Sequence, residues 1–121
     1  MAAQPLSTRR QLKALAEARR GVIVPGAFNA LSARVIADLG FEAIYVTGAG
    51  VTNMWFGMPD QGFMGLAEIA EHTARIRDAV ELPLIVDADT GFGNALNVRH
   101  TVRVLERAGA DCIQLDRKSV V

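Results

Sequence analysis

The sequence lacks the features that mark several large classes of protein. A single cysteine among 121 residues excludes an internal disulfide framework and fits a reducing compartment. No apolar run approaches the length of a membrane span, and the N-terminus lacks the charged start and apolar block of a secretory signal. Thirteen basic and thirteen acidic residues leave no net charge to attract nucleic acid or an anionic membrane. We therefore expect a soluble cytoplasmic protein that binds neither.

What the chain does contain is a core and a regular alternation of segments. Half of its residues are hydrophobic, which is enough for one domain. A helix is predicted over residues 7–20, and three more helices alternate with apolar segments after it. Such alternation predicts right-handed crossovers and a parallel sheet with its strands in sequential order. We therefore expect residues 1–121 to form one α/β domain, with strands at 22–25, 43–47, 84–87 and 112–115.

Each predicted helix carries boundary and packing signals. Ser7 can cap the first helix, and Gly21 is expected to stop it. Asn29 and Asn97 can cap the second and fourth helices, and Gly109 can end the fourth. Apolar residues at helical spacing predict the buried faces: Leu31, Val35 and Leu39 on the second helix, Leu66, Ile69, Thr73, Ile76 and Val80 on the third, and Val98, Val102 and Leu105 on the fourth.

The stretch from Leu84 to Gly93 carries the strongest chemical signal. Leu84 to Val86 is apolar, as in a strand covered on both faces, and Asp87 and Asp89 follow with one residue between them. If the strand continues, its period of two points both carboxylates the same way. Two close carboxylates repel each other unless a proton or a cation lies between them. A hard divalent cation, most simply Mg2+, fits such a pair because it takes oxygen ligands and keeps several waters.

The same motifs have other interpretations. One Asp of the pair can cap the next helix while the other is solvated. An EF-hand calcium loop is excluded, because the acid that it needs at the twelfth position is Val98. The glycines at 48 and 50 do not make a dinucleotide-binding fingerprint, because Asn53 stands where the third glycine belongs and a long loop is predicted over residues 48–65.

Polar residues follow three of the predicted strands at their carboxyl ends. Thr47, Asp87 and Asp116 each occupy such a position. In parallel α/β folds this edge of the sheet carries the ligand site. The backbone N–H groups of Thr47, Gly48 and Ala49 can form a small nest for an anion such as a carboxylate.

The remaining candidates have ordinary interpretations. Asp60 follows a proline, where turn chemistry is the common use of Asp. His72 and His100 are expected at the surface, and Cys112 is expected as a small buried hydrophobe. Trp55 and Phe56 either pack the long loop down or shield a site, and both alternatives stay open.

Four segments carry a resemblance to a known family. They are Tyr45-Val-Thr-Gly-Ala-Gly, Met58-Pro-Asp-Gln-Gly, Val86-Asp-Ala-Asp-Thr-Gly-Phe-Gly and Ala108-Gly-Ala-Asp-Cys-Ile-Gln-Leu-Asp. From about Val22 to Asp116 the chain resembles the isocitrate lyase and phosphoenolpyruvate mutase superfamily. Its branch is most similar to methylisocitrate lyase, dimethylmalate lyase and oxaloacetate decarboxylase, with carboxyphosphonoenolpyruvate phosphonomutase as a sister branch. The resemblance implies a (β/α)8 barrel, of which this chain would supply the N-terminal half, with four parallel strands and outer helices.

The resemblance also implies a metal site. It assigns Asp87 as the direct ligand of Mg2+, with Mn2+ as an alternative ion. It assigns Asp60 and Asp89 to the waters of that ion. Asp116 stands where the family usually has Glu, and we predict it as a further metal ligand with a shorter reach.

A substrate site is implied beside the metal. The hydroxyl of Thr47, where the lyases usually have Ser, and the N–H groups of Gly48 and Ala49 would bind the carboxylate of a small substrate. Tyr45 would line the pocket, and we predict catalytic roles for Tyr45 and Asp60.

Departures from the family shape the expected function. The family continues after Leu115 with Glu-Asp-Gln and a mobile Lys-x-Cys-Gly-His loop that supplies the catalytic acid or base, whereas this chain reads Asp-Arg-Lys-Ser-Val-Val. A complete barrel takes roughly 250 residues, so we expect a truncated domain, with 117–121 a tail foreign to the family. The expected activity of the parent is Mg2+-dependent cleavage of a C–C bond in a 2-hydroxy or 2-oxo carboxylate. The alternatives are P–C bond chemistry and an inactive fragment that only associates, and a homo-oligomer is expected.

Overall fold

A four-stranded parallel sheet in the order β1-β2-β3-β4 forms the centre of the molecule. The structure is a computed structural model that describes residues 6–117. The predicted fold class is confirmed, since all three strand pairs are parallel and the strands stand in sequential order. The bounds are β1 Gly26–Ala27, β2 Ile44–Val46, β3 Leu84–Asp87 and β4 Cys112–Gln114. Most of the predicted tail, residues 118–121, lies outside the described residues.

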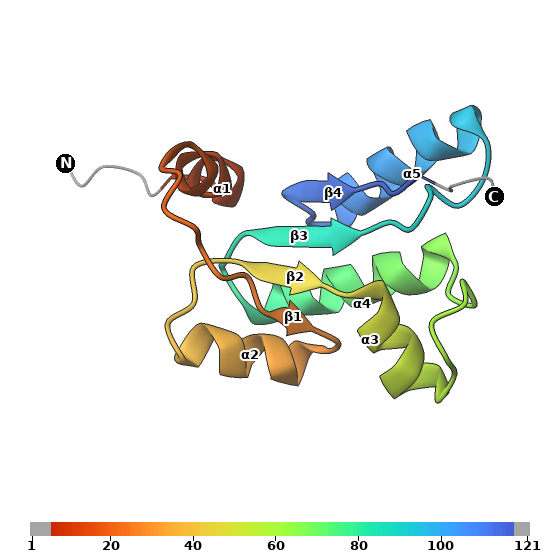
Figure 1. Cartoon of the computed structure of the whole chain (residues 1–121), viewed down its shortest axis with the longest axis horizontal. Coiled ribbons are helices and arrows are strands. Elements are labelled where there is room, and N and C mark those ends of the chain that lie inside the picture. Colours follow the sequence, from red (N-terminus) through yellow and green to blue (C-terminus); the bar gives the residue numbers. More distant parts are fainter. Residues whose placement is uncertain (1–5, 118–121) are drawn as a thin grey trace.

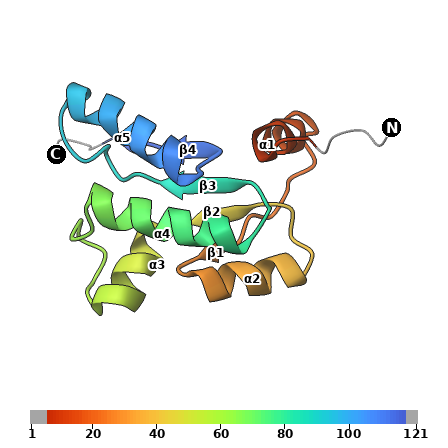
Figure 2. The same ribbon diagram turned by 180° about the vertical axis from the view of Figure 1, so that it is seen from behind.

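Helices alternate with these strands, and three of them, α2, α4 and α5, gather on one side of the sheet (Figure 1). Figure 2 shows α4 lying across the strands, with α2 and α5 on either side of it, and α4 packs against both of these helices. None of the helices in residues 6–117 is long and apolar enough to span a bilayer. The helical bounds are α1 Thr8–Glu17, α2 Ala30–Asp38, α3 Gly48–Val51, the π-helix η1 Thr52–Phe56, α4 Leu66–Ala79 and α5 Ala95–Ala108.

The core lies between the sheet and this helical layer. Strand residues alternate between the two faces of a sheet. In β2 and β3 the residues that face the helices are fully buried. The helix predicted third from the sequence is α4, and it buries Ile69, Thr73 and Ile76, as its periodicity predicted. The strand side of the core consists of Ile44, Val46, Leu84 and Val86.

The opposite face of the sheet has no helical cover among the described residues. Tyr45 and Ile85 on this face are half-buried, while Cys112 and Gln114 are exposed. We expected the strand that begins at Leu84, β3, to be covered on both faces, and for residues 6–117 this expectation is wrong. Cys112 is not a buried hydrophobe for the same reason, because its position in β4 turns it to the uncovered face.

The first strand lies further along the chain than its apolar residues indicated. We predicted residues 22–25, whereas β1 is Gly26–Ala27, which pairs with Tyr45 and Val46. Ile23 is 73% exposed and contributes no packing to the core. Among the described residues β1 and β4 are edge strands, each with a single neighbour. An apolar run therefore predicted the presence of a strand here but not its register.

Two helix boundaries also differ from their sequence signals. The first helix ends at Glu17, and Arg19 already has a positive φ of 49°, so Gly21 does not terminate it. The last helix begins three residues earlier than predicted, because Asn94 is its N-cap and Asn97 completes a capping box from inside the helix. The predicted caps at Asn29 and Gly109 are confirmed.

The apolar stripe predicted as the buried face of α2 points away from the core. Leu31, Val35 and Leu39 are 70%, 50% and 71% exposed. The helix instead packs through Ala33 and Ile36. The face that carries Ala33 and Ile36 is the one turned to the core, which leaves Leu31, Val35 and Leu39 on the outer surface. Helical spacing identified a common face but could not say which of two faces is buried.

Candidate metal and carboxylate site

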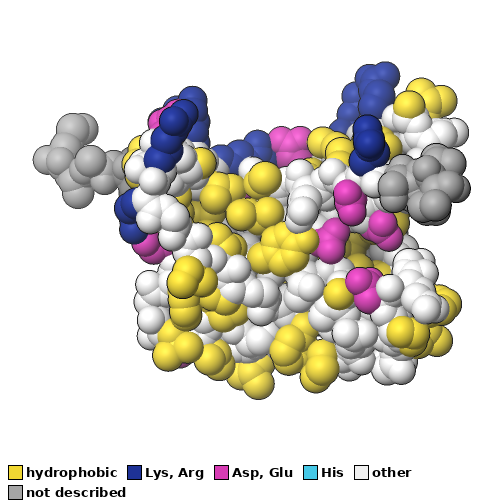
Figure 3. All heavy atoms as spheres, viewed as in Figure 1, with side chains coloured by type: hydrophobic (Ala, Val, Ile, Leu, Met, Phe, Trp, Pro, Cys, Tyr) yellow, Lys and Arg dark blue, Asp and Glu magenta, His cyan; other side chains and the backbone are white. Residues whose placement is uncertain are grey.

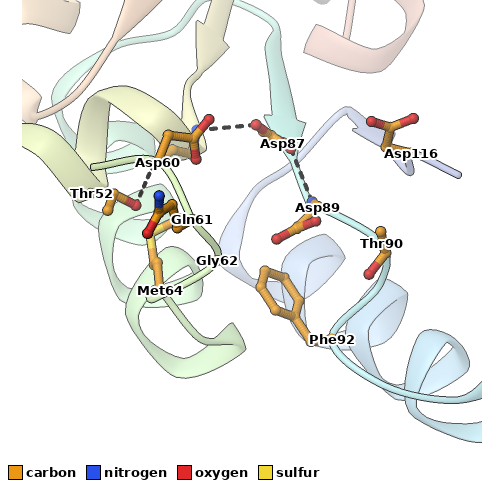
Figure 4. Close-up of a pocket in the computed structure, with 11 residues that line it drawn as sticks. Thr52, Asp60, Gln61, Gly62, Met64, Asp87, Asp89, Thr90, Phe92 and Asp116 are labelled. Atoms are coloured by element: carbon orange, nitrogen blue, oxygen red, sulfur yellow. Dashed lines mark hydrogen bonds between the residues drawn. The ribbon is translucent and has the colours of Figure 1, made fainter. Parts of the chain in front are cut away.

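A cavity of about 550 Å3 opens at the carboxyl edge of the sheet, and its lining is acidic. Figure 3 shows acidic side chains gathered near the ends of the strands, and Figure 4 shows them around the cavity. The acids of this lining are up to 56 positions apart in the sequence, from Asp60 to Asp116. The lining consists of Gly48, Thr52, Asp60, Gln61, Gly62, Met64, Asp87, Asp89, Thr90, Phe92 and Asp116.

Asp87, the last residue of β3, is held in place by two backbone groups. The N–H of Asp89 donates to its Oδ1 at 2.9 Å, and the N–H of Gly48 donates to its Oδ2 at 3.3 Å. A side chain at position 48 would collide with this carboxylate, because a Cβ there would lie 2.9 Å from Oδ2. The close approach of the backbone therefore requires glycine. Asp87 is fixed in orientation while its outer oxygen lone pairs remain free for a ligand.

Asp89 reaches the cavity by a turn of the chain, not by continuation of the strand. Its φ of 49° lies in the left-handed region, which Asp tolerates better than most residues. The predicted period of two therefore ends at Asp87. Backbone hydrogen bonds tie this turn to the end of β4, since Asp116 N–H donates to Asp89 O at 2.7 Å. The two acids line one cavity because the loops after β3 and β4 are bonded to each other.

The loop after η1 supplies the opposite wall. Residues 48–65 were predicted as a long loop, but the segment begins with α3 and η1. The Thr52 hydroxyl links these two helices by donating a hydrogen bond to Gly48 O at 2.9 Å. The chain then turns back, and Asp60 and Gln61 reach the cavity while Met64 anchors the segment in the core. Figure 4 shows Asp60 across the cavity from Asp89. Asp60 therefore lines the cavity together with the other acids, in addition to any role in the turn.

Tyr45 lies beside the cavity and stays protonated over the ordinary pH range. Its hydroxyl donates to Gln114 Oε1 at 2.6 Å. Burial and the negative charges of Asp87 and Asp116 raise the pKa of Tyr45 to about 12. The side chain is not among the lining residues. Its position suits a neutral hydrogen-bond donor near the acids and not a base at neutral pH.

Replacing Asp87 by asparagine is expected to lower the pKa of Tyr45, because the substitution removes a negative charge that opposes formation of phenolate. Tyr45 is the only tyrosine of the chain, so absorbance at 295 nm reports its ionisation directly. The raised pKa means that folding stability falls as pH rises from the unfolded value near 10 towards 12. Titrations are therefore run with circular dichroism alongside. The exposed Asp78→Asn is the control, and equal tyrosine pKa values in both variants would refute the coupling.

The predicted anion nest is only partly formed. Thr47 caps α3, since its Oγ1 accepts from Gly50 N–H at 3.1 Å. Gly48 lines the cavity, but its N–H is directed to Asp87. Thr47 and Ala49 do not line the cavity. Of the three residues predicted to bind a substrate carboxylate, the structure places only Gly48 at the acids.

The donor set of the cavity fits Mg2+ in its chemistry. Four carboxylates line it, and among residues 6–117 no lysine, arginine, histidine or cysteine does so. Within residues 6–117 no three acidic, imidazole or thiol groups are already arranged around one point as metal ligands. Mg2+ does not need such a cage, because it binds through one or two carboxylates and keeps several waters. Asp87 is suited to direct contact, and the other acids are suited to its hydration shell.

Several lining residues carried no separate signal in the sequence. Gln61 and Gly62 follow Asp60 in a segment that we interpreted through its acid alone. Phe92 lines the cavity with a φ of 59°, an uncommon conformation for an aromatic residue. Gly91 and Gly93 on either side of it also have positive φ, so the chain turns sharply here and brings the ring to the cavity.

Comparison with known proteins agrees with this geometry. The model of the family described as phosphoenolpyruvate phosphomutase matches residues 12–120. The 2-methylisocitrate lyase of Aeropyrum pernix is 49% identical over 105 residues, which are 87% of this chain and 34% of that protein. The 2,3-dimethylmalate lyase of Eubacterium barkeri is 42% identical over 111 residues, 92% of this chain and 38% of that protein. A crystal structure of phosphonopyruvate hydrolase with oxalate and Mg2+ superposes with a TM-score of 0.89 at 32% identity, covering 94% of this chain and 40% of that one.

Four parallel strands in sequence order, outer helices and a site at the carboxyl edge define part of a (β/α)8 barrel. The chain belongs to the phosphoenolpyruvate mutase and isocitrate lyase superfamily, whose members named above are lyases and related enzymes. It spans 34–38% of the length of the two curated relatives.

Proposed function

We propose that this chain carries the metal-binding part of a Mg2+-dependent lyase that cleaves a C–C bond in a small 2-hydroxy or 2-oxo carboxylate. The observation that carries the proposal is the cavity lined by Asp60, Asp87, Asp89 and Asp116, to which the described part of the chain adds no basic residue. Four carboxylates around one cavity repel each other and any carboxylate substrate unless a cation is present. A bound divalent cation would offset the repulsion among the four carboxylates and would also attract the carboxylate of the substrate.

The residues divide the work as follows. Asp87, oriented by the N–H groups of Gly48 and Asp89, would bind the ion directly. Asp60, Asp89 and Asp116 would hold its waters. When bound, the ion supplies electrostatic stabilisation for negative charge that develops on the substrate oxygens. Tyr45 would act as a neutral hydrogen-bond donor at the rim, since its raised pKa keeps the proton on the phenol.

The names of the relatives support the substrate class. The two curated relatives are lyases of methylisocitrate and dimethylmalate, both small carboxylates. The crystal structure of phosphonopyruvate hydrolase contains oxalate together with Mg2+. Oxalate can offer a metal two oxygens on adjacent carbons, and a 2-oxo or 2-hydroxy carboxylate can do so with one carboxylate oxygen and its keto or hydroxyl oxygen.

Chemistry at a P–C bond is the second candidate. It is favoured by the match to the phosphoenolpyruvate phosphomutase family and by the TM-score of 0.89 to phosphonopyruvate hydrolase. Both candidates use the same metal and differ in the group that leaves. An inactive associating fragment is the third alternative, because the described lining offers no lysine, cysteine or histidine as an acid or base.

Calorimetry with oxalate tests the shared part of the proposal. We expect oxalate to bind in the presence of Mg2+ and not in its absence, and Asp87→Ala to abolish the binding. The exposed Asp78→Ala is the matched control. Oxalate binding that is independent of Mg2+ would contradict the proposal. Assays for pyruvate release from 2-methylisocitrate and for phosphate release from phosphonopyruvate then separate the two chemistries, and absence of both products identifies the inactive alternative.

A further inference from the structure

A side-chain hydrogen bond crosses the uncovered face of the sheet above β3. The hydroxyl of Tyr45, on β2, donates to Oε1 of Gln114, on β4, at 2.6 Å. The strand β3 lies between these two strands (Figure 1). Because neighbouring strands are only about 4.8 Å apart, a tyrosine side chain can pass over one strand and reach a side chain of the next. The bond therefore spans β3.

The register of the strands places Asp87 beside this bond. Tyr45 pairs with Ile85, and Gln114 pairs with Asp87. Residues two apart in a strand face the same side, so Asp87 shares the uncovered face with Tyr45 and Gln114. After burial, the negative charge of Asp87 is the largest cause of the raised pKa of Tyr45. The phenol thus lies close to the carboxylate that suits direct contact with a metal, and yet its proton is directed to Gln114.

The carboxylate of Asp87 has a limited number of places for donors. A carboxylate offers about four lone-pair sites. The N–H groups of Asp89 and Gly48 take up one on each oxygen, and the remaining sites are open to a cation. A phenol that donated to Asp87 would fill a third site, and such a charge-assisted bond is stronger than a bond to a neutral amide. A neighbouring tyrosine therefore competes with a metal unless another acceptor holds its proton.

We propose that Gln114 is a positioning residue for the metal site: by accepting the proton of Tyr45 it keeps the phenol from bonding to Asp87 and leaves that carboxylate open to the divalent cation. The proposal rests on the metal role proposed above for Asp87. Gln114 acts through Tyr45, because it does not itself line the cavity. An amide suits this task, since its carbonyl accepts a hydrogen bond without adding a further negative charge beside the acids.

A double-mutant cycle followed by Mn2+ binding tests the proposal. Gln114→Leu removes the acceptor at similar size and frees the phenol to bond to Asp87, so we expect the dissociation constant of Mn2+ to rise about tenfold. Tyr45→Phe alone leaves no competing proton and is expected to bind Mn2+ as the wild type does. The double variant Q114L/Y45F is expected to recover wild-type affinity. A merely structural role of Gln114 would not be rescued by the loss of a second polar group.

The outcomes of the cycle are distinct, provided that circular dichroism shows all variants to be folded. Unchanged Mn2+ affinity in Gln114→Leu, or a double variant as weak as Gln114→Leu, would overturn the role of Gln114. Weakening by Tyr45→Phe as large as by Gln114→Leu would overturn it too. These results leave Asp87 as the ligand, whereas failure of the proposed function would appear as Mn2+ binding that is insensitive to Asp87→Ala.

Raman spectroscopy of the phenol supplies an independent readout. Tyr45 is the only tyrosine, and the intensity ratio of the tyrosine doublet depends on the hydrogen bonding of its hydroxyl. We expect saturating Mg2+ to leave this ratio unchanged in the wild type, where Gln114 holds the proton. In Gln114→Leu the ratio should change, because the cation displaces the phenol from Asp87. A change on Mg2+ addition that is as large in the wild type as in Gln114→Leu would contradict the proposal.

Discussion

Replacing Asp111 by alanine is expected to destabilise the chain by about 3–5 kcal/mol, because it leaves a partly buried guanidinium without its partner. Asp111 is 4% exposed and Arg77 is 21% exposed, and their atoms Oδ2 and Nη1 lie 3.1 Å apart. The same carboxylate accepts from Thr8 Oγ1 at 2.6 Å and from Leu84 N–H at 2.9 Å. It therefore ties α1, α4 and β3 together at the amino edge of the sheet. A loss of this size is a large part of the roughly 5–15 kcal/mol that holds a domain folded.

Urea unfolding followed by circular dichroism measures this effect. The matched control is Glu106→Ala, which breaks the ion pair with Arg9, a pair whose side chains are about half exposed. We expect that control to cost less than about 1 kcal/mol, because solvent screens exposed ion pairs. Equal losses in the two variants would mean that Asp111 makes no special contribution to the fold.

Replacing Asp87 by alanine is expected to remove the stabilisation that Mg2+ gives to the folded chain. A ligand that binds only the folded state stabilises it by about 2.7 kcal/mol at 100 times its dissociation constant. Asp87 is the acid of the cavity whose carboxylate is oriented by two backbone N–H groups, so we expect it to be the direct ligand. The melting temperature of the wild-type chain should therefore rise with Mg2+ concentration, and that of Asp87→Ala should not.

Asp78→Ala controls for general effects of charge on Mg2+ binding, since Asp78 is exposed on α4 and lies outside the cavity. We expect this variant to show the same Mg2+-dependent rise as the wild type. A rise that persists in Asp87→Ala would place the ion elsewhere.

The elements that were predicted well have signals that depend on short-range chemistry. Asn29 marked the start of α2 and Gly109 marked the end of α5, because capping involves only the adjacent turn of helix. The parallel order of the strands followed from the alternation of strands and helices, and it is confirmed.

The errors arose where long-range packing decides the outcome. Leu31 and Leu39 share a face of α2, but contact with the sheet selected Ala33 and Ile36 for burial. Cys112 is apolar in character, yet its register in β4 turns it to the uncovered face. Neither choice is encoded in the local pattern.

In the candidate site, too, short-range signals were predicted from the sequence and long-range packing was not. The position of Asp87 at the end of a strand could be read from the sequence, because the apolar run before it marks β3. The arrival of Asp60 at the same cavity depends on η1 and on Met64, which direct the loop back to the sheet. Motif resemblance grouped these acids, and periodicity alone could not have done so.

The measurement that tests the central claim most directly is a titration of the chain with Mn2+ followed by electron paramagnetic resonance. Mn2+ takes the same oxygen ligands as Mg2+ and loses its free-ion signal on binding. We predict one bound Mn2+ per chain, displaced by Mg2+, with binding abolished by Asp87→Ala and retained by Asp78→Ala. Binding of Mn2+ with equal affinity by the wild type and Asp87→Ala, or no binding by a folded wild-type chain, would contradict the assignment of the acidic cavity as a divalent-metal site.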